Sequence, residues 1–229
     1  MKGHLKNLLN IAVVFSLSMA LGFATNNQIV INGIVLVFII HWLLYIPANI
    51  FKTEKFYDLT GSLSYISVIS CILYSKVQDF ESGIGEVVIS LAIIIWSARL
   101  GTFLFLRIKK DGEDKRFREF KKSWSKFLVA WTTSGMWVTI CSACAMTAIA
   151  SENIIELNTI FFIGLFMFVF GFSLEIIADY QKTKFRSISA NKDKFISSGL
   201  WSKSRHPNYV GEIILWLGIS VMSFSNLEG

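Results

Sequence analysis

The chain has 229 residues, of which 53% are apolar (Ala, Val, Ile, Leu, Met, Phe, Trp, Tyr or Cys) and only 17% are charged. A soluble domain carries about 25% charged residues and roughly 45–50% apolar ones, so the composition excludes a disordered or collagen-like chain, and three cysteines exclude a disulfide framework. The net charge of +6 in so apolar a chain favours contact with anionic lipid headgroups or an anionic cofactor over nucleic acid. We therefore expect an integral membrane protein.

Seven apolar stretches are long enough, or nearly long enough, to cross a bilayer as helices, which takes roughly 20 residues. They lack the alternation of strands, and lipid leaves backbone groups unsatisfied in anything but helices and closed barrels. In chain order they are Leu8–Ala24, Ile29–Phe51, Leu59–Ser75, Ile84–Leu106, Phe127–Ala150, Leu157–Ala178 and Val210–Phe224. The sequence thus predicts an all-α fold, a polytopic integral membrane helical bundle of about seven transmembrane helices in a single domain over residues 1–229.

The distribution of Lys and Arg orients these spans. Of the 22 basic residues, all but two lie at the N-terminus or in the links 52–58, 107–126 and 179–209, which alternation of spans places on one side. The other side holds Lys76, and Arg99 lies inside the fourth span. Because cytoplasmic loops are enriched in Lys and Arg, we expect the N-terminus and these links in the cytoplasm.

Ionisable side chains inside apolar spans are costly and mark candidate functional sites. Arg99 lies in the fourth span, Glu175 near the end of the sixth and Glu212 near the start of the seventh. Two interpretations of Arg99 are open. Either it binds a cofactor or substrate, or it snorkels or pairs with a carboxylate and joins helices.

The end of the sixth span carries a regular charge pattern. If this helix continues into the cytoplasm, one of its faces carries Glu175, Asp179, Lys182 and Arg186. Carboxylates near the membrane can bind hydroxyl groups, and a guanidinium further along the helix can bind a phosphate. The alternative is a solvated face without a ligand.

The segment before the seventh span combines basic residues with a helix start. Pro207 suits the first position of a helix, where its missing N–H costs nothing, and the free N–H groups of that turn and the basic residues of 203–206 together attract anions. Asn208 and Glu212 share a face and can reach one ligand, while Gly211 lets another group approach the helix closely. The pattern fits a lipid phosphate, a nucleotide or an ordinary basic helix start.

These motifs resemble the membrane-bound steroid 5-alpha-reductase family, in its bacterial branch, and the related sterol reductases. The resemblance rests on Ser-Arg-His-Pro-Asn-Tyr-x-Gly-Glu at 204–212 and Asp-Tyr-Gln-x-x-x-Phe-Arg at 179–186. It implies NADPH-dependent reduction of a carbon–carbon double bond conjugated to a carbonyl, in a steroid-like or other enone substrate that enters from the bilayer. It also implies a bacterial inner membrane, with the cofactor on the cytoplasmic side formed by the links 107–126 and 179–209.

The resemblance also implies a set of cofactor residues. We expect NADPH between the cytoplasmic ends of the fourth, sixth and seventh spans, held by Arg99, Glu175, Asp179, Arg186, Arg205, His206, Asn208, Tyr209 and Glu212. Four of these match dinucleotide positions of the family, namely Asp179, Arg186, Asn208 and Glu212. Arg205, His206 and Tyr209 match the form seen in sterol reductases.

The catalytic residues follow less directly from the resemblance. The Gln-Glu dipeptide that polarises the carbonyl in the family is absent, and its closest local counterpart is Tyr57-Asp58, with Trp96 or Arg99 in place of a distant Tyr. A carboxyl group in low dielectric can stay protonated and donate a hydrogen bond, so Tyr57 and Asp58 are the expected catalytic pair. The alternative is that Tyr57 anchors the span at the interface and Asp58 caps its helix.

A second family shares part of the motif. Arg-His-Pro-x-Tyr-x-Gly also resembles isoprenylcysteine and phospholipid methyltransferases, which bind S-adenosylmethionine. Those enzymes do not need the Asp-Tyr-Gln…Arg face, so the upstream residues favour the reductase. A non-enzymatic lipid-binding or scaffolding membrane protein is the third interpretation.

No metal site and no nucleic-acid partner are expected. Cys141 and Cys144 lie in the middle of a span without a nearby His, where small neighbours indicate close helix packing. His41, inside the second span, is expected to be a packed, hydrogen-bonded side chain.

Overall fold

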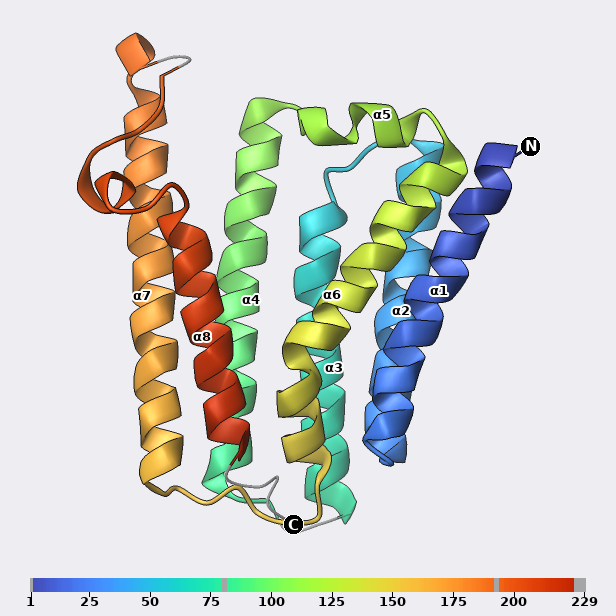
Figure 1. Cartoon of the computed structure of the whole chain (residues 1–229), viewed down its shortest axis with the longest axis vertical. Helices are drawn as coiled ribbons and strands as arrows, with labels where there is room; N and C mark the ends of the chain where they lie inside the picture. Colours follow the sequence, from blue (N-terminus) through green and yellow to red (C-terminus); the bar gives the residue numbers. More distant parts are fainter. Residues whose placement is uncertain (1, 80–81, 192–193, 225–229) are drawn as a thin grey trace. The chain divides into compact units, whose positions relative to one another are not determined.

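The computed structural model describes residues 2–79, 82–191 and 194–224, and all regular structure in these ranges is helical (Figure 1). The predicted all-α fold is confirmed for this part of the chain. Its elements are α1 (Lys2–Ala24), α2 (Gln28–Ile50), α3 (Tyr57–Asp79), α4 (Ile84–Asp111), η1 (Lys115–Phe117), α5 (Arg118–Lys121), α6 (Trp124–Ala150), α7 (Thr159–Ser187), η2 (Ser189–Asn191), η3 (Gly199–Ser202) and α8 (Pro207–Phe224).

Five of these helices are long and apolar enough to cross a bilayer, namely α1, α2, α4, α6 and α7. They coincide with the first, second, fourth, fifth and sixth predicted spans. The third and seventh predicted spans form helices of 23 and 18 residues, α3 and α8, which fall short of the same measure. Both carry polar residues, since α3 buries Thr60, Ser62 and Ser64 and the first two turns of α8 carry Asn208 and Glu212. The described helices therefore fit an integral membrane protein, and the count of seven spans is not confirmed.

The chain divides into two compact units, Met1–Ile155 and Glu156–Gly229. In the first unit α3 packs against α2, α4 and α6, and α1 packs against α2 and α6. In the second unit α7 and α8 lie antiparallel and in contact along their length (Figure 1). The prediction of a single domain over residues 1–229 stays a prediction.

The outer faces of the first two helices are apolar. Leu9 and Leu17 on α1 and Leu43 on α2 are each about 60% exposed. Apolar side chains facing outward are what a lipid environment requires, whereas water would favour polar ones. The buried hydroxyl groups of α3 face the opposite way, into the first unit.

Lys76, the one basic residue predicted on the outer side, is fully buried in the first unit. Its ammonium group donates to the carbonyl oxygens of Ser151, Glu152 and Asn153 at 2.6, 3.0 and 3.2 Å. These carbonyls follow the last turn of α6, where the helix dipole favours a cation. The buried Lys76 ammonium group therefore pairs with the carbonyl groups that follow the C-terminal end of α6.

Four glycines allow the backbones of α7 and α8 to touch. Gly164 and Gly171 on α7 are seven residues apart, as are Gly211 and Gly218 on α8. A Cβ atom built on Gly211 would lie 2.6 Å from the carbonyl oxygen of Gly171, and one built on Gly218 would lie 2.6 Å from that of Gly164. Small residues permit such close helix contacts. The close approach predicted at Gly211 is confirmed, and the approaching group is the backbone of α7.

The membrane orientation can be tested on the two ends of α6. Lys115 and Glu152 are exposed and lie near opposite ends of this helix, whose 27 residues span about 40 Å. In a chain whose Cys71, Cys141 and Cys144 are replaced by alanine, a membrane-impermeant maleimide should label Glu152→Cys in intact cells. Lys115→Cys should react only after permeabilisation. Equal labelling of both in intact cells would contradict the orientation.

Candidate functional site

The predicted charged face of the sixth span lies on one continuous helix, because α7 runs on to Ser187. Glu175 and Asp179 are buried, with 3% and 6% of their surfaces exposed, whereas Arg186 is exposed. The Lys182 ammonium lies 4.7 Å from the centre of the Trp201 ring. The face therefore offers carboxylates inside the second unit and a guanidinium at its solvent end.

The link after α7 folds back onto this helix through contacts of Gln181 and Trp201, whose roles sequence analysis missed. The Trp201 indole N–H donates to the Ala178 carbonyl oxygen at 3.0 Å, and the Leu200 N–H donates to Gln181 Oε1 at 3.0 Å. Gly199, beside them, has a φ of +61°, which favours glycine. Gln181 belongs to the Asp-Tyr-Gln motif, so the motif itself was the available signal. These contacts fix the segment that leads to α8.

The helix of the seventh predicted span, α8, begins at Pro207, which is the first helical position that the proline predicted and three residues before the predicted span. Asn208 follows, and its amide oxygen is buried without a hydrogen-bond partner among the described residues. Glu212, one turn later, lies close enough to Asp179 for their charges to interact. An amide oxygen and two carboxylates from facing helices are all acceptors, so this end of the second unit can bind a ligand rich in hydroxyl or amide N–H groups.

The remaining candidates of the second unit lie at the same end. His206 and Tyr209 stack with their ring centres 5.3 Å apart. Arg186 and Arg205 are exposed, and neither forms an ion pair with a carboxylate in the described part of the chain. Their guanidinium groups are therefore available to an anion.

Arg99 lies on α4 in the first unit, whereas the other eight cofactor candidates belong to the second. Its guanidinium is 5.0 Å from the centre of the Phe103 ring. The aromatic face provides a cation–π contact for a charge inside an apolar helix. A role of Arg99 toward the cofactor stays a prediction.

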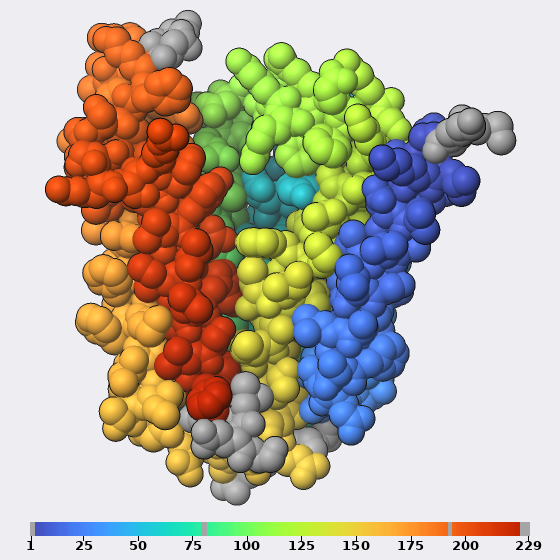
Figure 2. Space-filling view, viewed as in Figure 1, coloured from blue at the N-terminus to red at the C-terminus, as the bar shows by residue number. Residues whose placement is uncertain are grey.

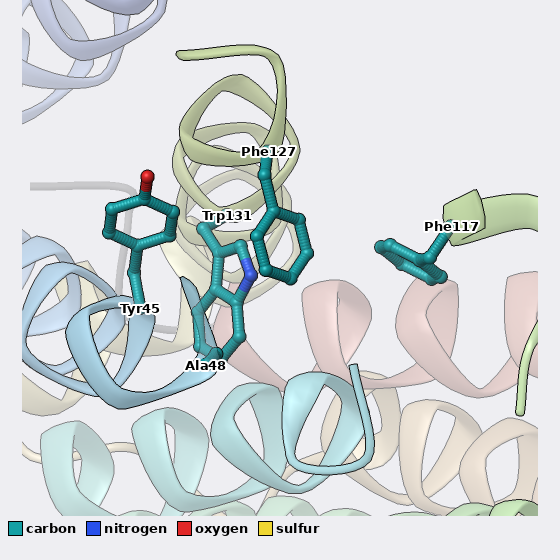
Figure 3. Close-up of a cluster of buried hydrophobic side chains, with 5 residues drawn as sticks. All are labelled: Tyr45, Ala48, Phe117, Phe127 and Trp131. Atoms are coloured by element: carbon teal, nitrogen blue, oxygen red, sulfur yellow. The ribbon is translucent and has the colours of Figure 1, made fainter. Parts of the chain in front are cut away.

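Tyr57 begins α3 and packs against a cluster of buried hydrophobic residues. Figure 3 shows the members of this cluster, Tyr45, Ala48, Phe117, Phe127 and Trp131. Its ring centre is 4.7 Å from that of Phe117 and 5.5 Å from that of Trp131. Its hydroxyl donates to the Ala130 carbonyl oxygen on α6 at 3.0 Å. The ring is therefore held on two sides and its hydroxyl is directed at α6.

Asp58 follows Tyr57 and is half-buried in the first turn of α3. It makes no hydrogen bond or ion pair with any other described residue, although the charges of Arg107 and Arg116 act on it. A half-buried carboxyl group without a partner is available to a ligand.

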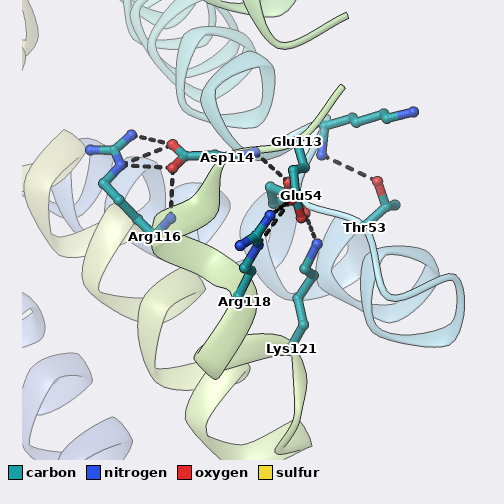
Figure 4. Close-up of polar contacts among 8 residues, drawn as sticks. Thr53, Glu54, Glu113, Asp114, Arg116, Arg118 and Lys121 are labelled. Atoms are coloured by element: carbon teal, nitrogen blue, oxygen red, sulfur yellow. Dashed lines mark hydrogen bonds and ion pairs between the residues drawn. The ribbon is translucent and has the colours of Figure 1, made fainter. Parts of the chain in front are cut away.

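Glu54, which sequence analysis did not single out, contacts the segment that contains η1 and α5 (Figure 4). This segment covers one end of the first unit (Figure 2). Glu54 is 4% exposed, and its carboxylate accepts from the Asp114 N–H at 2.7 Å and from the Lys121 ammonium at 2.5 Å. Burial acts to raise the pKa of Asp114, but hydrogen bonds from Arg116 outweigh it and hold that pKa below its usual value. A lone Glu in a basic link was the only signal in the sequence.

Comparisons with known proteins add to this geometry. A family model described as "Protein of unknown function (DUF1295)" matches residues 42–229. The "Probable 7-dehydrocholesterol reductase" of Acanthamoeba polyphaga mimivirus is 39% identical over 81 residues, which cover 28% of this chain and 18% of that protein. The chain thus matches less than a fifth of this curated relative's length. No solved structure matches the chain.

Proposed function

We propose that the chain is a membrane oxidoreductase, because of the family to which it belongs. This family is described as "Protein of unknown function (DUF1295)" and consists of steroid 5-alpha-reductase-like proteins. The partial similarity to a protein named as a sterol reductase supports the same class of reaction. In its finer form the proposal is an NADPH-dependent reduction of a carbon–carbon double bond conjugated to a carbonyl. The substrate is a steroid-like or other lipophilic enone that enters from the bilayer, in the inner membrane of a bacterium.

The observation that carries the proposal is the unsatisfied amide oxygen of Asn208. A buried acceptor without a donor costs about 1–3 kcal/mol, and a ligand that donates to it removes this cost. Glu212 and Asp179 are further acceptors at the same place. The ribose hydroxyls and the carboxamide of a nicotinamide dinucleotide are donors of the required kind.

Cations complement the negative end of such a ligand. Arg186 and Arg205 lie at the end of α7 and just before α8, with their guanidinium groups exposed. Guanidinium forms bidentate hydrogen bonds with phosphate, and the free N–H groups at the start of α8 favour an anion. These cations and acceptors support NADPH as the ligand of the second unit, and we propose His206 and Tyr209 as its aromatic neighbours.

When bound, NADPH supplies a hydride. Addition of a hydride to the β-carbon of an enone moves negative charge onto the carbonyl oxygen, and hydrogen-bond donors aimed at that oxygen stabilise the transition state. We assign this role to Tyr57, by its hydroxyl, and to Asp58, in its protonated form. The hydrophobic cluster that packs against the Tyr57 ring shields that ring from water.

Binding of NADPH to the detergent-solubilised protein should raise its melting temperature, and S-adenosylmethionine should leave it unchanged. Loss of a charge-assisted hydrogen bond costs about 1.5–3 kcal/mol, so Arg186→Ala should weaken NADPH binding roughly tenfold to a hundredfold. Lys184→Ala is the matched control, because Lys184 is also exposed but two residues away and thus on another face of α7. A response to S-adenosylmethionine alone would overturn the proposal in favour of a methyltransferase.

A further inference from the structure

A polar side chain in the interior of the first unit has no part in the function proposed so far. His41 on α2 is fully buried, as was expected of a packed, hydrogen-bonded histidine. Its Nδ1 lies 2.8 Å from the Val37 carbonyl oxygen and 3.2 Å from the Ser64 hydroxyl, and its Nε2 lies 3.2 Å from the Ser134 hydroxyl on α6. Ionisable groups at such positions are functional candidates by default.

The neighbours of His41 decide where its hydrogen lies. A carbonyl oxygen only accepts, so Nδ1 beside Val37 carries the hydrogen. Ser64 is consistent with this, because its own hydrogen is donated to the Thr60 carbonyl oxygen at 2.9 Å. His41 Nε2 therefore presents a lone pair and accepts the hydrogen of Ser134.

This hydrogen bond makes Ser134 differ from its neighbours on α6. Thr132 and Ser142 donate to the carbonyl oxygen four residues earlier, the usual choice for a hydroxyl inside a helix. For Ser134 that carbonyl belongs to Ala130, and it is occupied instead by the hydroxyl of Tyr57 at 3.0 Å. Ser134 and Tyr57 are thus two donors competing for one acceptor.

We propose that His41 is a positioning residue for Tyr57, because it draws the Ser134 hydrogen away from Ala130 and so leaves that carbonyl to the Tyr57 hydroxyl. The inference rests on the proposed function, in which Tyr57 donates to the substrate oxygen. The Ala130 carbonyl is already an acceptor within α6. The oxyanion that forms on the substrate is a stronger acceptor, so the Tyr57 hydroxyl turns from Ala130 to this oxyanion. No proton leaves His41 in this step. Its lone pair only fixes the direction of one neighbouring hydroxyl.

The proposal makes a prediction that simple packing does not. In His41→Phe the Ser134 hydrogen turns to Ala130 and displaces Tyr57, so kcat for NADPH oxidation with 4-cholesten-3-one should fall roughly tenfold to a hundredfold, as expected for a misplaced catalytic group. Ser134→Ala removes the competing donor. The double variant should therefore recover to within about twofold of Ser134→Ala alone.

Controls separate positioning from stability. Thr132→Val removes a comparable bond between the same helices, that of the Trp42 indole N–H at 3.1 Å, and should leave kcat unchanged. A second measurement leaves His41 in place, so that misfolding of a His41 variant does not affect its result. The chain has three histidines, and in a ¹⁵N-histidine spectrum Ser134→Ala should shift the Nε2 signal of the Nδ1-protonated imidazole.

The outcomes distinguish this inference from the function on which it rests. If the wild-type chain oxidises no NADPH with any enone, the proposed function fails and the inference fails with it. If the wild type is active but the losses in His41→Phe and Ser134→Ala multiply in the double variant, His41 only packs and the inference alone is wrong. An unchanged imidazole spectrum in Ser134→Ala would also refute it.

Discussion

Replacing Gly211 by alanine should force α7 and α8 apart and remove the proposed cofactor site of the second unit. The new Cβ atom would lie 2.6 Å from the Gly171 carbonyl oxygen and 2.7 Å from the Glu175 backbone nitrogen. Backbone atoms cannot turn away as a flexible side chain can. Overpacking of this kind costs typically 1–3 kcal/mol, and it moves Asn208 and Glu212 away from Asp179. Both the melting temperature and NADPH affinity should fall.

A glycine with space around it is the matched control for this variant. Gly61 lies within α3, and the nearest atom to its added Cβ is the Ser134 hydroxyl oxygen at 3.9 Å. Gly61→Ala should therefore keep the stability or raise it slightly, since alanine is the better helix former. If Gly211→Ala melts at the wild-type temperature and still binds NADPH, the close contact of α7 and α8 does not build the site.

Asp58→Asn and Tyr57→Phe should each lower kcat by about 10²–10³-fold, the usual effect of removing one donor from a developing oxyanion. Asp58 has no hydrogen-bond partner among the described residues, so its loss leaves no other side chain unpaired. NADPH affinity should stay unchanged, because neither residue belongs to the second unit. NADPH oxidation against a panel of enones and the NADPH thermal shift measure the two quantities separately.

The converse result would reassign these two residues. Full turnover in both variants, together with loss of NADPH binding in Asn208→Ala, would keep the cofactor site and remove the donors. Tyr57 would then be an interfacial anchor and Asp58 part of a helix start. The Asn208→Ala variant serves as the reference, because the unsatisfied amide oxygen carries the cofactor proposal.

The helices of this protein could be predicted from the sequence because their signals are local. Runs of apolar residues in every predicted span became helices, and Pro207 marked the first residue of α8. The charged face from Glu175 to Arg186 also followed from spacing, since α7 continues as a helix through it. Five of the seven predicted spans also meet the measure of length and apolarity, whereas α3 and α8 carry more polar residues and fall short of it.

The contacts that could make a site were decided by the tertiary structure. The sequence placed Gly171 and Gly211 forty residues apart, and only packing showed that their backbones touch. In the same way, nothing local indicates that Ser134 gives its hydrogen to His41 and leaves the Ala130 carbonyl to Tyr57. Helix formation depends on neighbours along the chain, whereas the partner of a buried donor or acceptor depends on which residue of another helix lies within about 3 Å of it.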